Sequence, residues 1–279
     1  MTVKEALAEG QKKLSLRAIP EAALESELLL RHVLDVSPTN LFLRYNDPLS
    51  SDQECSYFRL IESRLAGTPS AYLTGKREFY GLTFSVNPYV LIPRPETELL
   101  VTRALTIAEG HPRPIIADIG TGCGAIAITI AKHLPQAVVF AVDISPAALA
   151  TAQENAHRHN VADRITFLLG DLLSPLPEVV DIIAANLPYV RSAELPSTGE
   201  PYLALYGGKS GIDLITRLIR EAPDKLKPEA SILLEIGQGH EAEVCRLLHQ
   251  ALPVATLQTF CDLAGITRLI QATLAPTSG

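Results

Sequence analysis

The sequence predicts an α/β protein in which an open, mostly parallel sheet follows a small N-terminal helical bundle and a β-hairpin linker. Three observations support this fold. Apolar residues follow a helical spacing over about the first 75 residues, a short stretch then alternates, and short apolar runs alternate with helical segments after it. The length of 279 residues fits about two domains.

The helical bundle is predicted over residues 1–74. Phe58, Ile61 and Leu65 recur at helical spacing, and Gly67-Thr68-Pro69 marks a turn between segments. Nothing in this part of the chain resembles a catalytic constellation. We therefore expect a packing or docking module.

A β-hairpin linker is predicted over residues 75–96, and the second domain over residues 97–279. Residues 78–86 alternate and are rich in aromatic and β-branched side chains, with Gly81 at the turn. Helical spacing resumes over residues 97–108.

The second domain alternates strands with helices, which implies a mostly parallel sheet covered on both faces. Pro135 ends a helix over residues 125–134, and Ser145 caps the next helix with Pro146 in its first turn. The predicted strands are residues 115–119, 137–142, 165–169, 180–185, 231–236, 255–260 and 266–271.

Composition excludes several classes of function. The formal net charge of −7 argues against sequence-independent binding to a phosphate backbone, so no direct nucleic-acid partner is expected. The four cysteines lack metal-ligand spacing, and we expect neither a metal site nor a disulfide framework. No secretory signal or membrane-spanning run is present, so a cytoplasmic protein without membrane attachment is expected.

A glycine-rich turn between the first strand and its helix predicts a cofactor site. Gly120, Gly122 and Gly124 allow a tight turn against which a ligand can lie, and the helix start offers free N–H groups. Asp143 ends the next strand, where a carboxylate can accept both ribose hydroxyls. The pattern indicates an adenosine-bearing cofactor, and with Ala125 it also satisfies the relaxed nicotinamide fingerprint.

Asp118, two residues before the first glycine, favours S-adenosylmethionine over a dinucleotide. A carboxylate there suits a ligand with a positive amino group and would repel a pyrophosphate. Asp171 follows the third strand and could accept a hydrogen bond from the adenine amine, although it could equally cap the next turn. Cys123 in the turn is interpreted as a small filler and not as a nucleophile.

Asn186-Leu187-Pro188-Tyr189 follows the fourth strand, at the edge of the sheet where open α/β proteins bind ligands. Asn186 offers a carbonyl acceptor, and Pro188 restricts Leu187 to extended geometry, which would aim its backbone carbonyl into the cleft. Two such oxygens suit a planar, conjugated NH₂ group. Tyr189 would supply a face for stacking and for a nearby cation. We hypothesise that the two oxygens orient the substrate nitrogen toward a sulfonium methyl group.

Three other functions compete with this interpretation. An adenine N6-methyltransferase would use the same four residues but needs a basic groove and a means of extruding the base. A nicotinamide-dependent oxidoreductase would explain the glycines and Asp143 but leaves Asn186 to Tyr189 without a role. A cofactor-binding scaffold without catalysis conflicts with the intact Asn186, Pro188 and Tyr189.

The chain resembles the HemK/PrmC family of protein-glutamine N5-methyltransferases over nearly its whole length. The resemblance rests on residues 67–75, 78–82, 90–98, 118–125, 186–189, 200–201, 205, 207–208, 234–238 and 262–266. The glycine turn is shared with many methyltransferases, whereas the Ile92-Pro93-Arg94-Pro95-Glu96-Thr97-Glu98 string is more specific to this family.

The resemblance implies a class I (Rossmann-like) methyltransferase domain behind a helical substrate-docking domain. It implies transfer of a methyl group from S-adenosylmethionine to the side-chain amide of the glutamine in the Gly-Gly-Gln motif of class 1 peptide-chain release factors. By position, Asn186 to Tyr189 would hold the glutamine, with Asn186, Pro188 and Tyr189 as the catalytic residues. By position, the resemblance implies cofactor contacts at Gly120, Thr121, Gly122, Cys123, Gly124, Asp143 and Asn186, and we expect Asp118, Asp171 and Leu172 to contact the cofactor as well.

Two positions depart from the family pattern. Leu187 stands where the family usually has Pro, and its N–H needs a partner, although only its carbonyl is required. Leu172 stands where an aromatic residue is common, which weakens adenine stacking and leaves an apolar contact.

Overall fold

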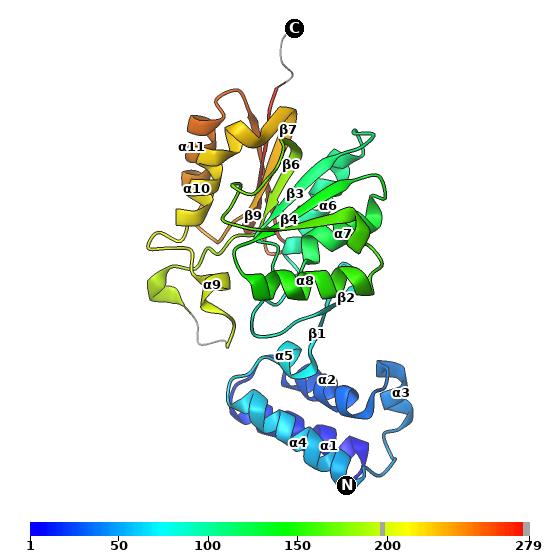
Figure 1. Cartoon of the computed structure of the whole chain (residues 1–279). Helices are drawn as coiled ribbons and strands as arrows, with labels where there is room; N and C mark the ends of the chain where they lie inside the picture. Colours follow the sequence, from blue (N-terminus) through cyan, green and yellow to red (C-terminus); the bar gives the residue numbers. More distant parts are fainter. Residues whose placement is uncertain (196–198, 276–279) are drawn as a thin grey trace. The chain divides into compact units, whose positions relative to one another are not determined.

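A computed structural model describes residues 1–195 and 199–275 of the chain. These residues form two compact units, one of residues 1–76 and 199 and the other of residues 77–195 and 200–275. Each unit is described by itself below, with the elements labelled as in Figure 1. The domain boundaries expected from the sequence stay a prediction.

The first unit is a helical bundle, as predicted. Thr2 caps the N-terminus of the first helix in a capping box with Glu5. Ser50 caps the fourth helix in the same way, with Gln53. The buried Ser26 and Tyr57 hydroxyls share a hydrogen bond of 2.6 Å inside a core of aliphatic side chains. The helices are α1 (Val3–Leu16), α2 (Ala22–Leu34), α3 (Pro38–Leu43), α4 (Ser51–Leu65) and α5 (Ser70–Thr74).

The predicted hairpin forms from β1 (Lys76–Phe79) and β2 (Leu82–Ser85). Tyr80 and Gly81 at its turn both have positive φ, 50° and 72°, which matches the twist of a tight hairpin. Asn155 fixes the second strand because its Oδ1 accepts from the Ser85 N–H at 2.7 Å and its Nδ2 donates to the Ser85 carbonyl at 3.0 Å.

The second unit contains a seven-stranded sheet in the order β5-β4-β3-β6-β7-β9-β8 (Figure 1). Neighbouring strands from β5 to β7 are parallel, and β9 runs antiparallel to both of its neighbours. This is the mostly parallel sheet predicted. The strands are β3 (Ile115–Ile119), β4 (Val138–Asp143), β5 (Ile165–Leu169), β6 (Val180–Ala185), β7 (Leu226–Glu235), β8 (Thr256–Cys261) and β9 (Thr267–Thr273).

Helices cover both faces of this sheet. Figure 1 shows α6, α7 and α8 on one face and α10 and α11 on the other. The predicted Ser145 cap of α8 is confirmed, because its side chain accepts from the Ala148 N–H and Pro146 begins the helix. The elements are α6 (Thr97–Ala108), α7 (Ala125–His133), α8 (Pro146–Arg158), α9 (Tyr202–Leu205), α10 (Asp213–Glu221) and α11 (Glu241–Ala251), with short 3₁₀ turns at Ala162–Arg164, Ser192–Glu194 and Ala222–Lys225.

The order of the strands reverses between β3 and β6, which creates the crevice where open α/β sheets bind ligands. Ile119 is in register with Ala185, so the glycine turn after β3 and the Asn186 segment after β6 begin side by side. Both β3 and β6 are buried almost completely. The core therefore holds these two segments on rigid elements.

Candidate active site

A cavity of about 600 Å³ lies within the second unit at the carboxyl ends of its parallel strands. Segments that follow β3, β4, β5 and β6 contribute to its wall. The predicted site residues that line it are Gly120, Thr121, Gly122, Cys123, Asp143, Asp171, Leu172, Asn186, Leu187 and Pro188. The structure thus brings most of the sequence-predicted residues to one cavity.

The glycine turn lies against this cavity. Gly122 has a φ of 57°, and a Cβ atom added to it would meet no atom within 4 Å, so its backbone is open to a ligand. Gly124 has a φ of 83° and serves packing instead, because an added Cβ would lie 2.7 Å from the Ile128 side chain and 3.1 Å from that of Ala152. Gly124 is not among the described residues that line the cavity.

Asp143 joins the end of β4 to the glycine turn. Its Oδ2 accepts from the Gly122 N–H at 2.9 Å, and its Oδ1 accepts from the Ser145 N–H at 2.9 Å. Burial raises the pKa of this carboxyl, and the backbone hydrogen bonds oppose the rise. Each carboxyl oxygen still has a free lone pair for a ligand hydroxyl.

Asp118 lies behind the turn and not on the cavity wall. It is fully buried, and its Oδ2 accepts from the Thr121 hydroxyl at 2.6 Å and from the Ala127 N–H at 3.1 Å. Its Oδ1 has no hydrogen-bond partner among the described residues, and burial raises the pKa of the group to about 7. The side chain ties the end of β3 to α7, and its direct contact with a cofactor stays a prediction.

Asp171 and Leu172 follow β5 at another part of the wall. Asp171 pairs with Arg217 at 2.5 Å, so its carboxylate already has a cationic partner. Leu172 is buried and has a φ of 48°, an uncommon conformation for a leucine, and it presents an apolar surface to the cavity. This placement is compatible with the apolar contact expected for Leu172.

Asn186 lines the cavity, and its Nδ2 donates a hydrogen bond of 2.9 Å to the Thr97 hydroxyl. This contact leaves the Asn186 Oδ1 available to a ligand. Leu187 is buried, and its N–H has no hydrogen-bond acceptor among the described residues. The described part of the chain therefore supplies no partner for this N–H.

Tyr189 lies outside the set of residues that line the cavity. Its hydroxyl donates to Glu235 Oε1 at 3.4 Å, and burial raises the pKa of Tyr189 to about 12. The stacking role expected for its ring stays a prediction. Two residues that contact the Asn186–Tyr189 segment were not predicted as site residues: Thr97, which bonds Asn186, and Glu235, which bonds Tyr189. The position of Glu235, a charged residue at the end of an apolar strand, could have indicated it.

The charged side chains around the cavity suit a ligand that has sugar hydroxyls and no strong negative charge. Arg94 pairs with Glu200 at 2.5 Å and Arg217 pairs with Asp171, so both arginines on the wall have anionic partners. Asp143 offers acceptors for hydroxyl groups, and the rest of the wall is largely apolar. The backbone at Gly122 is open, so an adenosine-bearing ligand can lie against it. S-adenosylmethionine therefore fits this set of residues.

Comparison with known proteins finds relatives for both parts of the chain. A model of the PrmC N-terminal domain matches residues 5–75, and a model of the methyltransferase small domain matches residues 96–199. The release factor glutamine methyltransferase of Moorella thermoacetica is 39% identical over 278 residues, covering 98% of each chain. The protein of the same name from Koribacter versatilis is 38% identical over 278 residues, covering 97% of this chain and 98% of the other.

The chain belongs to the release factor glutamine methyltransferase family.

The fold of this family member is that of class I methyltransferases. The crystal structure of the ribosomal protein L11 methylase from Lactobacillus delbrueckii subsp. bulgaricus matches it with a TM-score of 0.51 and 20% identity, covering 68% of this chain and 83% of the other. Membership of the family decides against the oxidoreductase and the inactive scaffold, because its members are methyltransferases.

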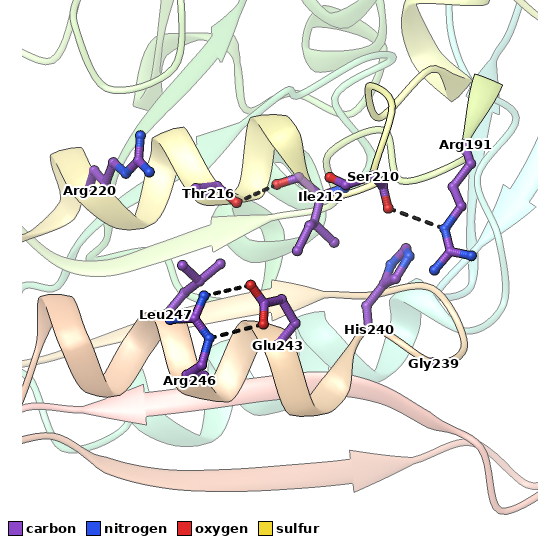
Figure 2. Close-up of a pocket in the computed structure, with 10 residues that line it drawn as sticks. All are labelled: Arg191, Ser210, Ile212, Thr216, Arg220, Gly239, His240, Glu243, Arg246 and Leu247. Carbon is purple, nitrogen blue, oxygen red and sulfur yellow. Dashed lines mark hydrogen bonds and ion pairs between the residues drawn. The ribbon is translucent and has the colours of Figure 1, made fainter.

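A second cavity of about 440 Å³ lies between α10 and α11 of the methyltransferase (Figure 2). Three arginines line it, but Arg246 is bound by both oxygens of Glu243, at 2.6 and 3.0 Å. Arg191 donates to the Ser210 carbonyl at 3.2 Å, and Figure 2 shows Arg220 at the opposite end. The cations do not converge on one point, so this cavity is not assigned a ligand.

Residues 1–195 and 199–275, which the structure describes, contain no group of three or more His, Cys, Asp or Glu side chains that could hold a metal ion. Across the same ranges, every helix is too short or too polar to cross a membrane.

Proposed function

We propose that the protein transfers the methyl group of S-adenosylmethionine to the side-chain amide nitrogen of the glutamine in the Gly-Gly-Gln motif of class 1 release factors. Family membership supports the reaction and the substrate class. The cavity at the ends of β3, β4 and β6 supports the location of the reaction.

The cofactor end of the cavity would be formed by the glycine turn and two strand ends. Asp143 would accept the ribose hydroxyls, and the open backbone at Gly122 would contact the ligand. Leu172 would pack on the adenine, and Asp171, paired with Arg217, would lie near its amine. The methyl group that the cofactor supplies is activated by the positive charge of the sulfonium sulfur.

The substrate end would be formed by Asn186, Leu187 and Pro188. Asn186 Oδ1 and the Leu187 carbonyl oxygen would each accept one N–H of the glutamine amide. An amide nitrogen is a poor nucleophile because its lone pair is delocalised, so orientation is the main requirement. Bringing two bound reactants into line can contribute roughly 7–11 kcal/mol at best, and acceptors aimed at the developing charge about 3–4 kcal/mol more.

The transfer would form a bond between the amide nitrogen and the methyl carbon as the carbon–sulfur bond breaks, and the electron pair of the broken bond would stay on sulfur. The methylated nitrogen then loses one proton to water. The protonated amide is acidic enough that the protein needs no strong base at this position.

The first unit would dock the release factor, as the resemblance implies for the PrmC N-terminal domain. We propose a cytoplasmic protein whose partner is the release factor and which needs no direct contact with nucleic acid. The formal net charge of −7 supports the last point.

The observation that most supports this proposal is the Asn186 amide, whose Nδ2 is held by Thr97 beside the cavity. Mass spectrometry of a recombinant class 1 release factor, incubated with the protein and S-adenosylmethionine, tests it. We expect a gain of about 14 daltons on the glutamine of the Gly-Gly-Gln motif, the mass of one methylene group. Methylation of DNA or RNA adenine, with the release factor unchanged, would favour the competing function.

A further inference from the structure

Two large apolar side chains of the short helix α9 are exposed at the rim of the cavity. Tyr202 is 57% exposed and Leu203 is 68% exposed. Residues 201–208 carry no charged side chain, so the surface that they present is neutral. Apolar side chains that stay exposed together beside a binding site indicate a contact with another molecule.

The chain that enters α9 is fixed to another part of the cavity wall. The Glu200 side chain is 3% exposed, and it pairs with Arg94 at 2.5 Å. The same carboxylate accepts from the Ile92 N–H at 3.2 Å. Glu200 therefore ties the start of this segment to the loop that precedes α6.

The chain that leaves α9 is fixed beside the substrate end of the cavity. Val190, which follows the Asn186–Tyr189 segment, donates to the Leu205 carbonyl at 2.9 Å and accepts from the Gly207 N–H at 2.9 Å. A Cβ atom added to Gly207 would lie 2.7 Å from the Pro188 carbonyl oxygen. Contacts on both sides of α9 thus hold its exposed side chains next to the proposed acceptors.

An aromatic surface leads along this segment from the cavity to the outside of the protein. Tyr206 lines the cavity, and its ring stacks on that of Tyr202, with 4.8 Å between the centroids and 26° between the planes. Tyr202 is not among the described residues that line the cavity, so its ring extends the surface outward. Leu203 adds an aliphatic contact at the rim. We call Tyr202, Leu203 and Tyr206 the α9 platform.

The chemistry of the substrate indicates what covers the α9 platform. A glutamine side chain is short, so its amide nitrogen can reach Asn186 only if the residues on either side of the glutamine lie at the mouth of the cavity. A glycine has no Cβ, so its main chain can lie flat against an aromatic ring. The Gly-Gly-Gln motif also carries no charge, which matches the neutral surface of residues 201–208.

We propose that the α9 platform binds the main chain of the release factor at the glycines next to the methylated glutamine. The inference rests on the proposed function, because it takes the release factor as the substrate and Asn186 as the residue that holds its glutamine. The platform would determine the affinity for the protein substrate and would take no part in the methyl transfer.

Steady-state kinetics with a release factor tests this role. We expect Tyr202→Ala and Leu203→Ala each to raise KM for the release factor about tenfold, the loss typical of an important interface side chain. The kcat should stay within about threefold of wild type, because the lost contact is the same before and during transfer. Tyr202→Phe keeps the ring and should have a KM within about twofold of wild type.

Val254→Ala is the matched control. Val254 is also 68% exposed, but it precedes β8, whose start lies at the edge of the sheet opposite the cavity. Its substitution should leave KM unchanged. Calorimetric titration should give Tyr202→Ala the wild-type affinity for S-adenosylmethionine. An unchanged KM in both platform variants, or a raised KM with an equal loss of cofactor affinity, would overturn the proposal.

Photo-crosslinking locates the contact without depending on methylation. With S-adenosylhomocysteine present, p-benzoylphenylalanine in place of Leu203 should cross-link to the release factor within or next to its Gly-Gly-Gln motif, as identified by mass spectrometry. The same replacement of Val254 should give no product at the motif. A Leu203 product elsewhere on the release factor, or none, would overturn the inference, while methylation by the wild type would leave the proposed function intact. A product at the motif without methylation by the wild type would refute the proposed function and support the docking role.

Discussion

Asn186 donates a hydrogen bond of 2.9 Å to Thr97, although the two residues lie 89 positions apart in the chain. The contact joins the end of a buried strand to the first residue of a helix, both of them rigid elements. In this contact the Nδ2 of Asn186 is bonded to Thr97, which leaves its Oδ1 available to the cavity. Because the proposed reaction needs an oxygen there, this hydrogen bond links the fold to the chemistry.

Replacing Asn186 by Ala removes the proposed acceptor. By analogy with the loss of an oxyanion-hole donor, we expect kcat to fall about 10²–10³-fold. Steady-state kinetics with a release factor measures this. Asn160→Gly is the control, because Asn160 is exposed and its φ of 58° is one that glycine adopts readily, so its rate should equal that of the wild type. Wild-type turnover by Asn186→Ala would reject the assigned role.

Alanine substitutions at two glycines of the turn should have different effects. At Gly124 a Cβ would meet Ile128 at 2.7 Å, so we expect the free energy of unfolding to fall by about 2–4 kcal/mol. At Gly122 the added Cβ has space, and the fall should be about 1–2 kcal/mol from its backbone conformation alone.

The same pair separates stability from cofactor binding. Gly122→Ala should weaken S-adenosylmethionine binding, because its Cβ enters the cavity. Urea unfolding and calorimetric titration measure the two effects. Equal destabilisation of the two variants, or unchanged affinity in Gly122→Ala, would contradict the geometry of the turn.

Asp118 should make the protein less stable as the pH rises. Its pKa is raised from 3.8 to about 7 by burial, so the folded state keeps a proton that the unfolded state has already lost between these values. The free energy of unfolding therefore falls across this window, by about 4 kcal/mol at most.

Asp118→Asn should remove this contribution. Asparagine stays neutral and keeps a carbonyl to accept from Thr121 and Ala127. Urea unfolding at about pH 5 and about pH 8 should then show a smaller loss of stability in the variant than in the wild type. The same loss in both proteins would show that Asp118 is ionised throughout.

Leu187→Pro tests the departure from the family pattern. The Leu187 N–H has no acceptor among the described residues, so its removal should keep kcat within about threefold of wild type. The buried leucine side chain is lost, and the free energy of unfolding should fall by about 1–3 kcal/mol. A large fall in kcat at full stability would show that this N–H takes part in the reaction.

Local patterns in the sequence predicted much of the second unit. The strands at 115–119, 165–169 and 180–185 have the predicted bounds, because each is a short, mostly apolar run between clear breaks. The strand predicted at 231–236 begins earlier, at Leu226. Its first half contains Pro228 and the exposed Glu229, whose φ is 63°, and so it lacked an apolar pattern.

Features that depend on distant parts of the chain could not be predicted in this way. The insertion of β9 between β7 and β8 is set by tertiary packing. We could identify the glycine turn, Asp143 and Asn186 from the sequence because their residue types, each placed at the end of a predicted strand, indicate ligand binding. Thr97 was missed because its contact with Asn186 appears only when α6 and β6 are brought together. Asp118 was predicted from its charge, whereas the structure buries it behind the turn.

A crystal structure of the protein with S-adenosylhomocysteine and a peptide that contains the methylated glutamine would test the central claim most directly. The account predicts that the reacting nitrogen lies about 2.9 Å from Asn186 Oδ1, with the Leu187 carbonyl on its other side. A nitrogen held by another group, away from the Asn186 oxygen, would contradict it.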